Sequence, residues 1–322
     1  MNNTTFTHYR EHLNGRQQHF VTAGEGPAVL FLHGFPDLWR GWSAQLSAVA
    51  AAGYLGIAPD LRGYGETEGS PDPEKYTAID VMADQLAILD HLGVDKVTVV
   101  AHDWGTTAGW AAVQLRPDRF ASIVAISVPW MPHGDRSLPQ ILVDEAPRDY
   151  YFPYFLIPGP ADAEFDADPR EFLRRIMYTN SAERPGGPPA MQTVNGSLLE
   201  GLAAPNGAMT FLPDAELDIY ADAFARSGAT AALNSYRGLH RSWELMTAWA
   251  DSIPNVPAIT IVGDRDLTVE MPGMREVFDA QARWLPRGRS TIWLDKTGHF
   301  AQMEAPELVS RHILDFLRES GA

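Results

Sequence analysis

The chain has 322 residues, 45% of them hydrophobic, which is enough to bury a large core in one large domain or two small ones. Its 41 acidic residues outnumber the 25 Lys and Arg, and the net charge of -16 argues against nucleic acid or an anionic membrane surface as a partner. The chain contains no cysteine, which excludes disulfides, thiolate metal sites and a Cys nucleophile.

The N-terminal segment gives no sign of export or of a metal site. Met1–Arg16 is polar and lacks the apolar stretch of a secretory signal. No apolar run in the chain approaches the roughly 20 residues needed to span a bilayer. These features, with the absence of cysteine, predict a soluble cytoplasmic protein. His8 and His12 could share a helix face, but no third ligand accompanies them, so we expect no metal.

Buried strands and amphipathic helices alternate in the first part of the chain and again at its end. Runs of Val, Ile and Leu without polar alternation are typical of parallel strands that are covered on both faces. This alternation predicts an α/β protein with a mostly parallel, doubly wound sheet. The expected elements, in chain order, are a strand at Ala28–Leu32, helices at Trp42–Ala52 and Ile79–Leu92, a strand at Lys96–Ala101, a helix at Thr106–Gln114, strands at Ser122–Ser127, Ala258–Val262 and Thr291–Leu294, and a helix at Pro306–Leu317.

A long insertion interrupts this pattern between Trp130 and about Asp251, where Pro, Gly and aromatic residues become frequent. We therefore expect an α/β core made of residues 1–130 and 252–322, with a helical cap at 131–251. The elements expected in the cap are helices at Pro169–Tyr178 and Pro213–Arg226 and a long Gly- and Pro-rich loop at Ala182–Gly207.

Asp103 lies between a buried strand and a helix, at the centre of a turn flanked by the small residues Ala101 and Gly105. This pattern is typical of the nucleophile elbow, a strained turn that holds a nucleophile at the carboxyl edge of a parallel sheet. Alternatively, Asp103 caps the helix that follows it. The small flanking residues favour the nucleophile.

A carboxylate nucleophile limits the chemistry. Attack on an ester would give a reactive anhydride, whereas attack on a saturated carbon gives an ordinary alkyl ester. An Asp nucleophile therefore fits the opening of an epoxide or the displacement of a halide. The alkyl ester must then be hydrolysed, and this second step requires a general base and an oxyanion hole.

An H-G-F-P motif begins at His33, directly after the first predicted strand. Together with the Asp103 turn, it resembles the α/β-hydrolase superfamily and, within it, the soluble epoxide hydrolases. This resemblance implies a cis peptide bond before Pro36 and an oxyanion hole formed by the backbone N–H groups of Phe35 and Trp104. It also implies that His33, Pro36 and Trp104 contact the substrate.

The resemblance extends to a general base and its acidic partner. The segment around His299, after the last predicted strand, is similar to the catalytic-histidine segment of the family. Histidine, with an ordinary pKa of about 6.5, can accept a proton from water at neutral pH. A carboxylate must orient this base, and Asp266 matches the family pattern because it lies three residues after Gly263. Asp264 is the alternative.

Two tyrosines of the insertion match the family's proton donors. Ring opening leaves an alkoxide that needs a proton, and tyrosine, with an ordinary pKa of about 10, keeps its proton at neutral pH. Tyr151 begins a stretch similar to the family's Y-x-x-x-F-Q-x-P-G, with Leu156 in place of Gln, and Tyr236 lies in an L-N-x-Y-R stretch. The alternative for either residue is packing within the cap, and Tyr150 and Tyr154 could be mistaken for Tyr151.

The sequence therefore predicts an enzyme that hydrolyses a small apolar epoxide to a vicinal diol, with water as its second substrate and without a cofactor. Haloalkane dehalogenases share the Asp-Trp pair of the turn, and there the Trp104 indole would bind the halide. A fluoroacetate-type haloacid dehalogenase and a ligand receptor without turnover are further alternatives. The oligomeric state is left open.

Overall fold

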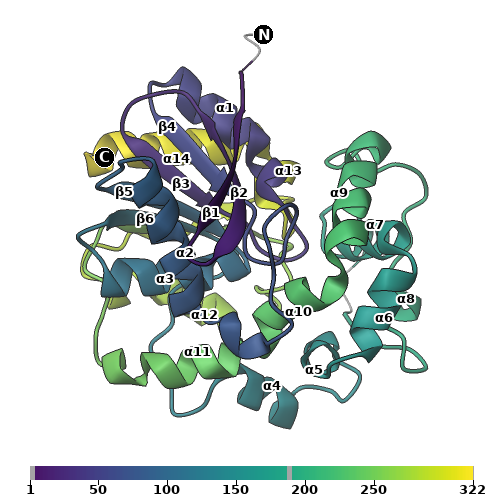
Figure 1. The fold of residues 1–322 in the computed structure, drawn as a ribbon. Coiled ribbons are helices and arrows are strands. Elements are labelled where there is room, and N and C mark those ends of the chain that lie inside the picture. The colour runs from purple at the N-terminus through teal and green to yellow at the C-terminus, as the bar shows by residue number, and fades with distance from the viewer. Residues whose placement is uncertain (1–3, 187–190, 322) are drawn as a thin grey trace.

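An eight-stranded sheet runs through the computed structural model, which describes residues 4–186 and 191–321 (Figure 1). The strand order is β1-β2-β4-β3-β5-β6-β7-β8, and β2 runs antiparallel to both of its neighbours while all the other pairs are parallel. The strands are β1 (Thr7–Leu13), β2 (Arg16–Ala23), β3 (Ala28–Leu32), β4 (Leu55–Pro59), β5 (Val97–His102), β6 (Phe120–Ile126), β7 (Ala258–Gly263) and β8 (Ile292–Leu294).

Helices cover both faces of the sheet. Successive side chains of a strand point to opposite faces, so Phe31 of β3 packs on the face of α1 and α14, whereas Leu30 packs on the face of α2 and α3. Strands that are buried on both sides in this way explain the apolar runs without polar alternation. The helices of this part are η1 (Trp39–Trp42), α1 (Ser43–Ala51), η2 (Pro73–Lys75), α2 (Ala78–His91), α3 (Trp104–Leu115), α12 (Met274–Trp284), α13 (Ala301–Glu304) and α14 (Pro306–Ser320).

The core elements predicted from hydrophobic patterning are confirmed. The five predicted strands are β3, β5, β6, β7 and β8, and the four predicted helices are α1, α2, α3 and α14, with ends that differ by a few residues at most. Within the two described stretches of chain, no helix is long and apolar enough to pass through a membrane.

The pattern missed the hairpin of β1 and β2 at the edge of the sheet. Its signal was the Asn14-Gly15 pair, whose φ angles of 48° and 74° form the two-residue turn that joins antiparallel strands. The polar composition of β1 concealed it. The shared helix face considered for His8 and His12 is wrong, because both residues lie on strand β1.

The insertion between β6 and β7 is helical, and Figure 1 shows α5 to α9 to one side of the sheet, with α10 leading back toward it. The two predicted helices are α7 and α9. The predicted loop 182–207 contains the short helix α8, and its residues 187–190 lie outside the described residues. The cap boundaries at 131 and 251 stay a prediction. The helices are α4 (Leu138–Glu145), α5 (Tyr151–Leu156), α6 (Pro160–Ala167), α7 (Pro169–Thr179), α8 (Leu198–Gly201), α9 (Asp214–Ser227), α10 (Ala229–Arg237), α11 (Leu239–Met246) and η3 (Thr247–Trp249).

Candidate active site

Asp103 occupies a strained turn between β5 and α3, as the sequence pattern predicts. Its φ of 51° lies in the region that L residues other than glycine rarely adopt. The turn approaches its neighbours so closely that a Cβ atom on Gly105 would lie 2.4 Å from the Leu32 carbonyl oxygen, and one on Gly34 would lie 2.3 Å from Asp103 Oδ1. Glycine is therefore required at position 105, in the turn itself, and at position 34, in the loop that lies against Asp103.

The two carboxylate oxygens of Asp103 have different surroundings. Oδ1 accepts a hydrogen bond of 2.8 Å from the Phe35 N–H, and the following bond to Pro36 is cis, as the family resemblance implies. Oδ2 lies 3.5 Å from His299 Nε2. Burial alone would raise the pKa of Asp103, but the hydrogen bond and charge of His299 hold it below its usual value. The carboxylate is therefore ionised. Trp104, whose backbone N–H is the second donor expected in the oxyanion hole, directly follows Asp103 and is the first residue of α3.

His299 is held between two carboxylates. Its Nδ1 lies 3.1 Å from Asp266 Oδ1, and Nε2 faces Asp103. Burial would lower the pKa of His299, but Asp266 and Asp103 together raise it to about 10. The imidazole is therefore protonated in the resting site at neutral pH. Asp264, the alternative acid, instead accepts the backbone N–H of Thr297 at 3.2 Å.

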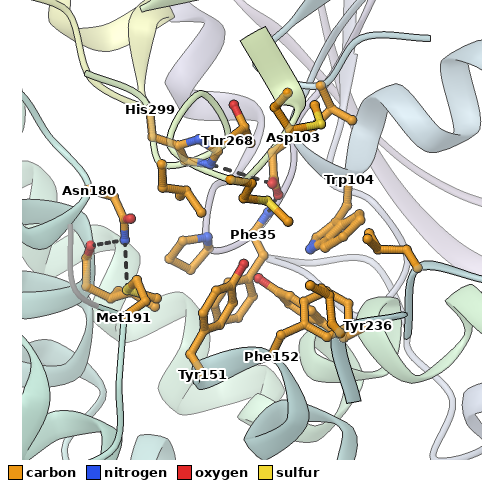
Figure 2. A pocket seen from close by; sticks show the side chains of 18 of the residues that line it. Phe35, Asp103, Trp104, Tyr151, Phe152, Asn180, Met191, Tyr236, Thr268 and His299 are labelled. Atoms are coloured by element: carbon orange, nitrogen blue, oxygen red, sulfur yellow. Dashed lines mark hydrogen bonds and ion pairs between the residues drawn. The ribbon is translucent and has the colours of Figure 1, made fainter. Parts of the chain in front are cut away.

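Tyr151 and Tyr236 face Asp103 across a buried cavity, and Figure 2 shows both hydroxyl groups directed toward the carboxylate. Tyr151 begins α5, Tyr236 lies on α10, and their ring centroids are 6.4 Å apart. Burial raises the pKa of both phenols well above 10, and the charge of Asp103 adds to this. Both therefore hold their protons and can donate hydrogen bonds. Tyr154, by contrast, hydrogen-bonds Glu164 within the cap.

The cavity encloses about 90 Å³ and is mostly apolar. Pro36 and Trp104 line it, as expected for residues that contact substrate. Across residues 4–186 and 191–321, no group of three or more His, Asp or Glu side chains is arranged to hold a metal ion. The apolar side chains of the lining are Phe35, Pro36, Trp104, Val128, Met131, Leu138, Leu142, Phe152, Ile176, Met191, Leu267, Met271, Met274 and Phe300.

His33 does not belong to this lining, so its assignment to substrate binding is corrected. Its Nε2 accepts the Leu61 N–H at 2.9 Å, which leaves Nδ1 to donate to the Gly34 carbonyl oxygen at 2.9 Å. Both nitrogens are thus used by the backbone, and the ring is fully buried. His33 stabilises the loops beside the nucleophile.

Comparison with known proteins identifies the family. A model of the alpha/beta hydrolase fold matches residues 27–158. Epoxide hydrolase 2 of Siraitia grosvenorii is 36% identical over 95% of this chain and 96% of its own length, and epoxide hydrolase A of Mycobacterium tuberculosis is 34% identical over 94% and 95%. The solved structure of epoxide hydrolase I from potato (Solanum tuberosum) is 34% identical and has a TM-score of 0.90 over 98% of this chain and 100% of that one.

This chain belongs to the epoxide hydrolases of the α/β-hydrolase fold. The resemblance that the motifs carry, and the fold class that it implies, are confirmed. Hydrolysis of an alkyl ester requires a general base that is held in position, as well as a nucleophile. Two groups around His299 fit that need, and sequence reasoning missed both.

The first is Ser127, at the end of β6. Its Oγ lies 3.0 Å from His299 Nδ1, and its φ of 74° is strained for a residue other than glycine. Thr268 adds to the same cluster, because its N–H donates to Asp266 Oδ1 at 2.9 Å and its hydroxyl donates to the Ser127 carbonyl oxygen at 3.0 Å. A single serine at the end of a buried strand belongs to no recognised motif, so the sequence gives no sign of this contact.

We expect Ser127→Ala to slow ester hydrolysis about 10-fold, which is the rate factor that corresponds to the free energy of one hydrogen bond. The rate of alkylation of the enzyme should fall by a smaller factor. The reason is that Ser127 contacts the base and not the nucleophile. Single-turnover and steady-state rates on one epoxide separate the two steps. Equal losses in both steps, or no loss, would contradict this role.

The second group is Glu304, which fixes the loop that carries His299. Its carboxylate accepts the N–H groups of Gly298 at 3.0 Å and Phe300 at 3.1 Å, on either side of the histidine. It also accepts the N–H of Ala182 from the cap at 2.8 Å. Three backbone donors on one partly buried carboxylate tie the cap to the catalytic loop. The sequence places Glu304 near His299 but gives no sign of these contacts.

Proposed function

We propose that this protein hydrolyses small apolar epoxides to vicinal diols through a covalent alkyl ester on Asp103. The observation that carries the proposal is the placement of one ionised carboxylate opposite two protonated phenols in a single buried cavity. A strained ring whose carbon meets Asp103 and whose oxygen meets Tyr151 and Tyr236 fits this arrangement. The family of the chain supports the same reaction.

The first step forms the ester. Asp103 Oδ2, the oxygen that Phe35 does not bind, attacks one epoxide carbon and the carbon–oxygen bond of the ring breaks. The released oxygen takes a proton from Tyr151 or Tyr236, while the other phenol donates a hydrogen bond to it. The low pKa of Asp103 keeps the nucleophile ionised.

The second step cleaves the ester. Esterification removes the negative charge of Asp103, so the pKa of His299 falls and its proton passes to the phenolate left by ring opening. Neutral His299, oriented by Asp266, then takes a proton from water, and the hydroxide attacks the ester carbonyl carbon. The Phe35 and Trp104 N–H groups stabilise the oxyanion. The tetrahedral intermediate collapses by breaking the ester bond between the carbonyl carbon and the substrate oxygen, and the departing alkoxide takes the proton of the carboxyl group that forms on Asp103. The diol leaves, and ionised Asp103 again faces protonated His299.

Water is the co-substrate, and the reaction needs no cofactor because the carboxylate, phenols and imidazole supply every proton and the nucleophile. We also place the protein in the cytoplasm without a nucleic-acid partner, which its lack of cysteine and net charge of -16 support. Haloalkane or haloacid dehalogenation is less well supported, because a departing halide needs no proton donor and two phenols face the nucleophile here.

The phenols provide the direct test of ring opening. We expect Tyr151→Phe and Tyr236→Phe each to reduce epoxide turnover about 10-fold or more, and the double variant to lose roughly 10²- to 10⁴-fold, the usual value of a general acid. Diol formation from styrene oxide measures the effect.

Tyr154→Phe is the matched control, because this neighbouring tyrosine hydrogen-bonds Glu164 and does not line the cavity. It should keep a rate near that of the wild type. A double variant at positions 151 and 236 that turned over at a similar rate would remove both tyrosines from the mechanism.

A further inference from the structure

Asn180 places a polar atom in the wall of the cavity that the reaction does not use. It follows α7, its side chain is only 3% exposed, and it lines the cavity beside Ile176 and Met191. Figure 2 shows it on the opposite side of the pocket from Trp104. Its backbone oxygen accepts the His299 N–H at 2.9 Å, so the residue is fixed against the catalytic loop.

The orientation of the Asn180 amide is determined by its neighbours. Nδ2 donates to the Ile176 carbonyl oxygen at 2.8 Å and to Met191 Sδ at 3.3 Å. A flipped amide would bring two oxygens together, so Oδ1 must be the free atom. Among the described residues this buried oxygen has no hydrogen-bond partner. It can only accept a hydrogen bond.

Most of the other polar groups of the lining are already engaged. The Trp104 indole N–H also has no hydrogen-bond partner among the described residues, but it can only donate. Asp103, His299 and the two tyrosines carry the chemistry, and the single proton of the Thr268 hydroxyl is shared between two acceptors, the Ser127 carbonyl oxygen and Asp266 Oδ1, each at 3.0 Å. Asn180 Oδ1 is therefore the acceptor that is left for the part of the substrate that does not react. Around it the wall is apolar, with the side chains of Ile176, Met191 and Phe300.

We propose that Asn180 Oδ1 accepts a hydrogen bond from a hydroxyl group on the substrate, so that the preferred epoxides carry an alcohol on an otherwise apolar substituent. This rests on the proposed epoxide hydrolysis. Asp103 and Asn180 lie on different sides of the pocket in Figure 2, so such a substituent would run from the Asp103 side toward Asn180. A carboxylate at the same place is disfavoured, because it offers no donor and would meet an amide oxygen.

A buried acceptor of this kind discriminates strongly. Asn180 Oδ1 is buried without a hydrogen-bond partner among the described residues, and a bound apolar chain leaves it unpaired. A hydroxylated chain supplies the missing hydrogen bond. A site built around such an acceptor therefore rejects an analogue that lacks the donor.

The test compares three series of terminal epoxides, lengthened one carbon at a time, whose far end carries a hydroxyl, a methoxy group or only hydrogen. The methoxy group can accept but cannot donate. We expect wild-type kcat/KM at the best chain length to favour the hydroxyl over the methoxy compound by about 10-fold or more. Asn180→Leu, which keeps the size of the side chain but has no acceptor, should bring this ratio to about 1.

Met191→Leu is the matched control, because it removes the sulfur that Nδ2 contacts and leaves Oδ1 in place. It should keep the ratio. A wild-type ratio near 1 at every chain length would overturn the proposal, even if Asn180→Leu fails to fold. A ratio that persists in Asn180→Leu would also overturn it. Equal losses of kcat/KM on all three series would do so as well, because they would assign Asn180 to the reaction itself. Diol formation from the unsubstituted series tests the proposed function separately.

Discussion

Replacing Asp103 with alanine is expected to abolish diol formation, with a loss on the order of 10⁴-fold or more. Among the described residues the covalent step has no other nucleophile in reach, because the remaining polar groups of the cavity are two phenols with a strongly raised pKa, a protonated imidazole, a hydroxyl, an amide and an indole N–H. Steady-state diol formation from an aryl epoxide measures the loss.

The Asp103→Ala variant must be shown to fold. The change leaves the Phe35 N–H without its acceptor and removes one of the two carboxylates beside His299, which costs about 1–3 kcal/mol in the free energy of unfolding. A chain of this size should tolerate that cost. Circular dichroism and thermal unfolding check it. Retained diol formation by the folded variant would overturn the assignment of Asp103.

The second large effect is expected for His299→Gln, which should stop the cycle after one turnover. Glutamine can still hydrogen-bond Asp266 but cannot take a proton from water at neutral pH. We expect steady-state turnover to fall by about 10³-fold or more, while one equivalent of epoxide per site is consumed in an initial burst.

The pH dependence of that burst has a predictable sign. His299 is what holds the pKa of Asp103 down against burial, so its removal raises the pKa of the nucleophile. Alkylation in His299→Gln should therefore require a higher pH than in the wild type. Asp264→Asn is the control, because this neighbouring carboxylate binds the Thr297 N–H and should leave turnover almost unchanged. Steady-state turnover by His299→Gln at the wild-type rate would exclude His299 as the base.

The sequence was informative where the function depends on short local motifs. The turn at Asp103, the H-G-F-P stretch and the segment of His299 each follow a buried strand, and parallel strands bring their carboxyl ends to one edge of a sheet. The structure accordingly brings Asp103, Asp266 and His299 together. The choice of Asp266 over Asp264 also agrees with the observed contacts.

What the sequence missed depends on contacts between distant segments. Ser127 reaches His299 across 172 positions of the chain, and Glu304 binds Ala182 across 122. Such pairings follow from the register of β6 and the path of the cap, which no local pattern encodes. Asn180 was missed for the same reason. His33 was misassigned because its motif lies beside the nucleophile while its ring turns into the core.

The covalent ester on Asp103 is the intermediate on which the whole mechanism depends, and mass spectrometry of His299→Gln detects it directly. The variant is exposed separately to an aryl epoxide and a haloalkane and then digested. We predict an adduct with the full mass of the epoxide on the peptide that contains Asp103. An alkyl adduct from the haloalkane alone would instead indicate a dehalogenase, and adducts from neither compound, or on another residue, would contradict the proposed mechanism.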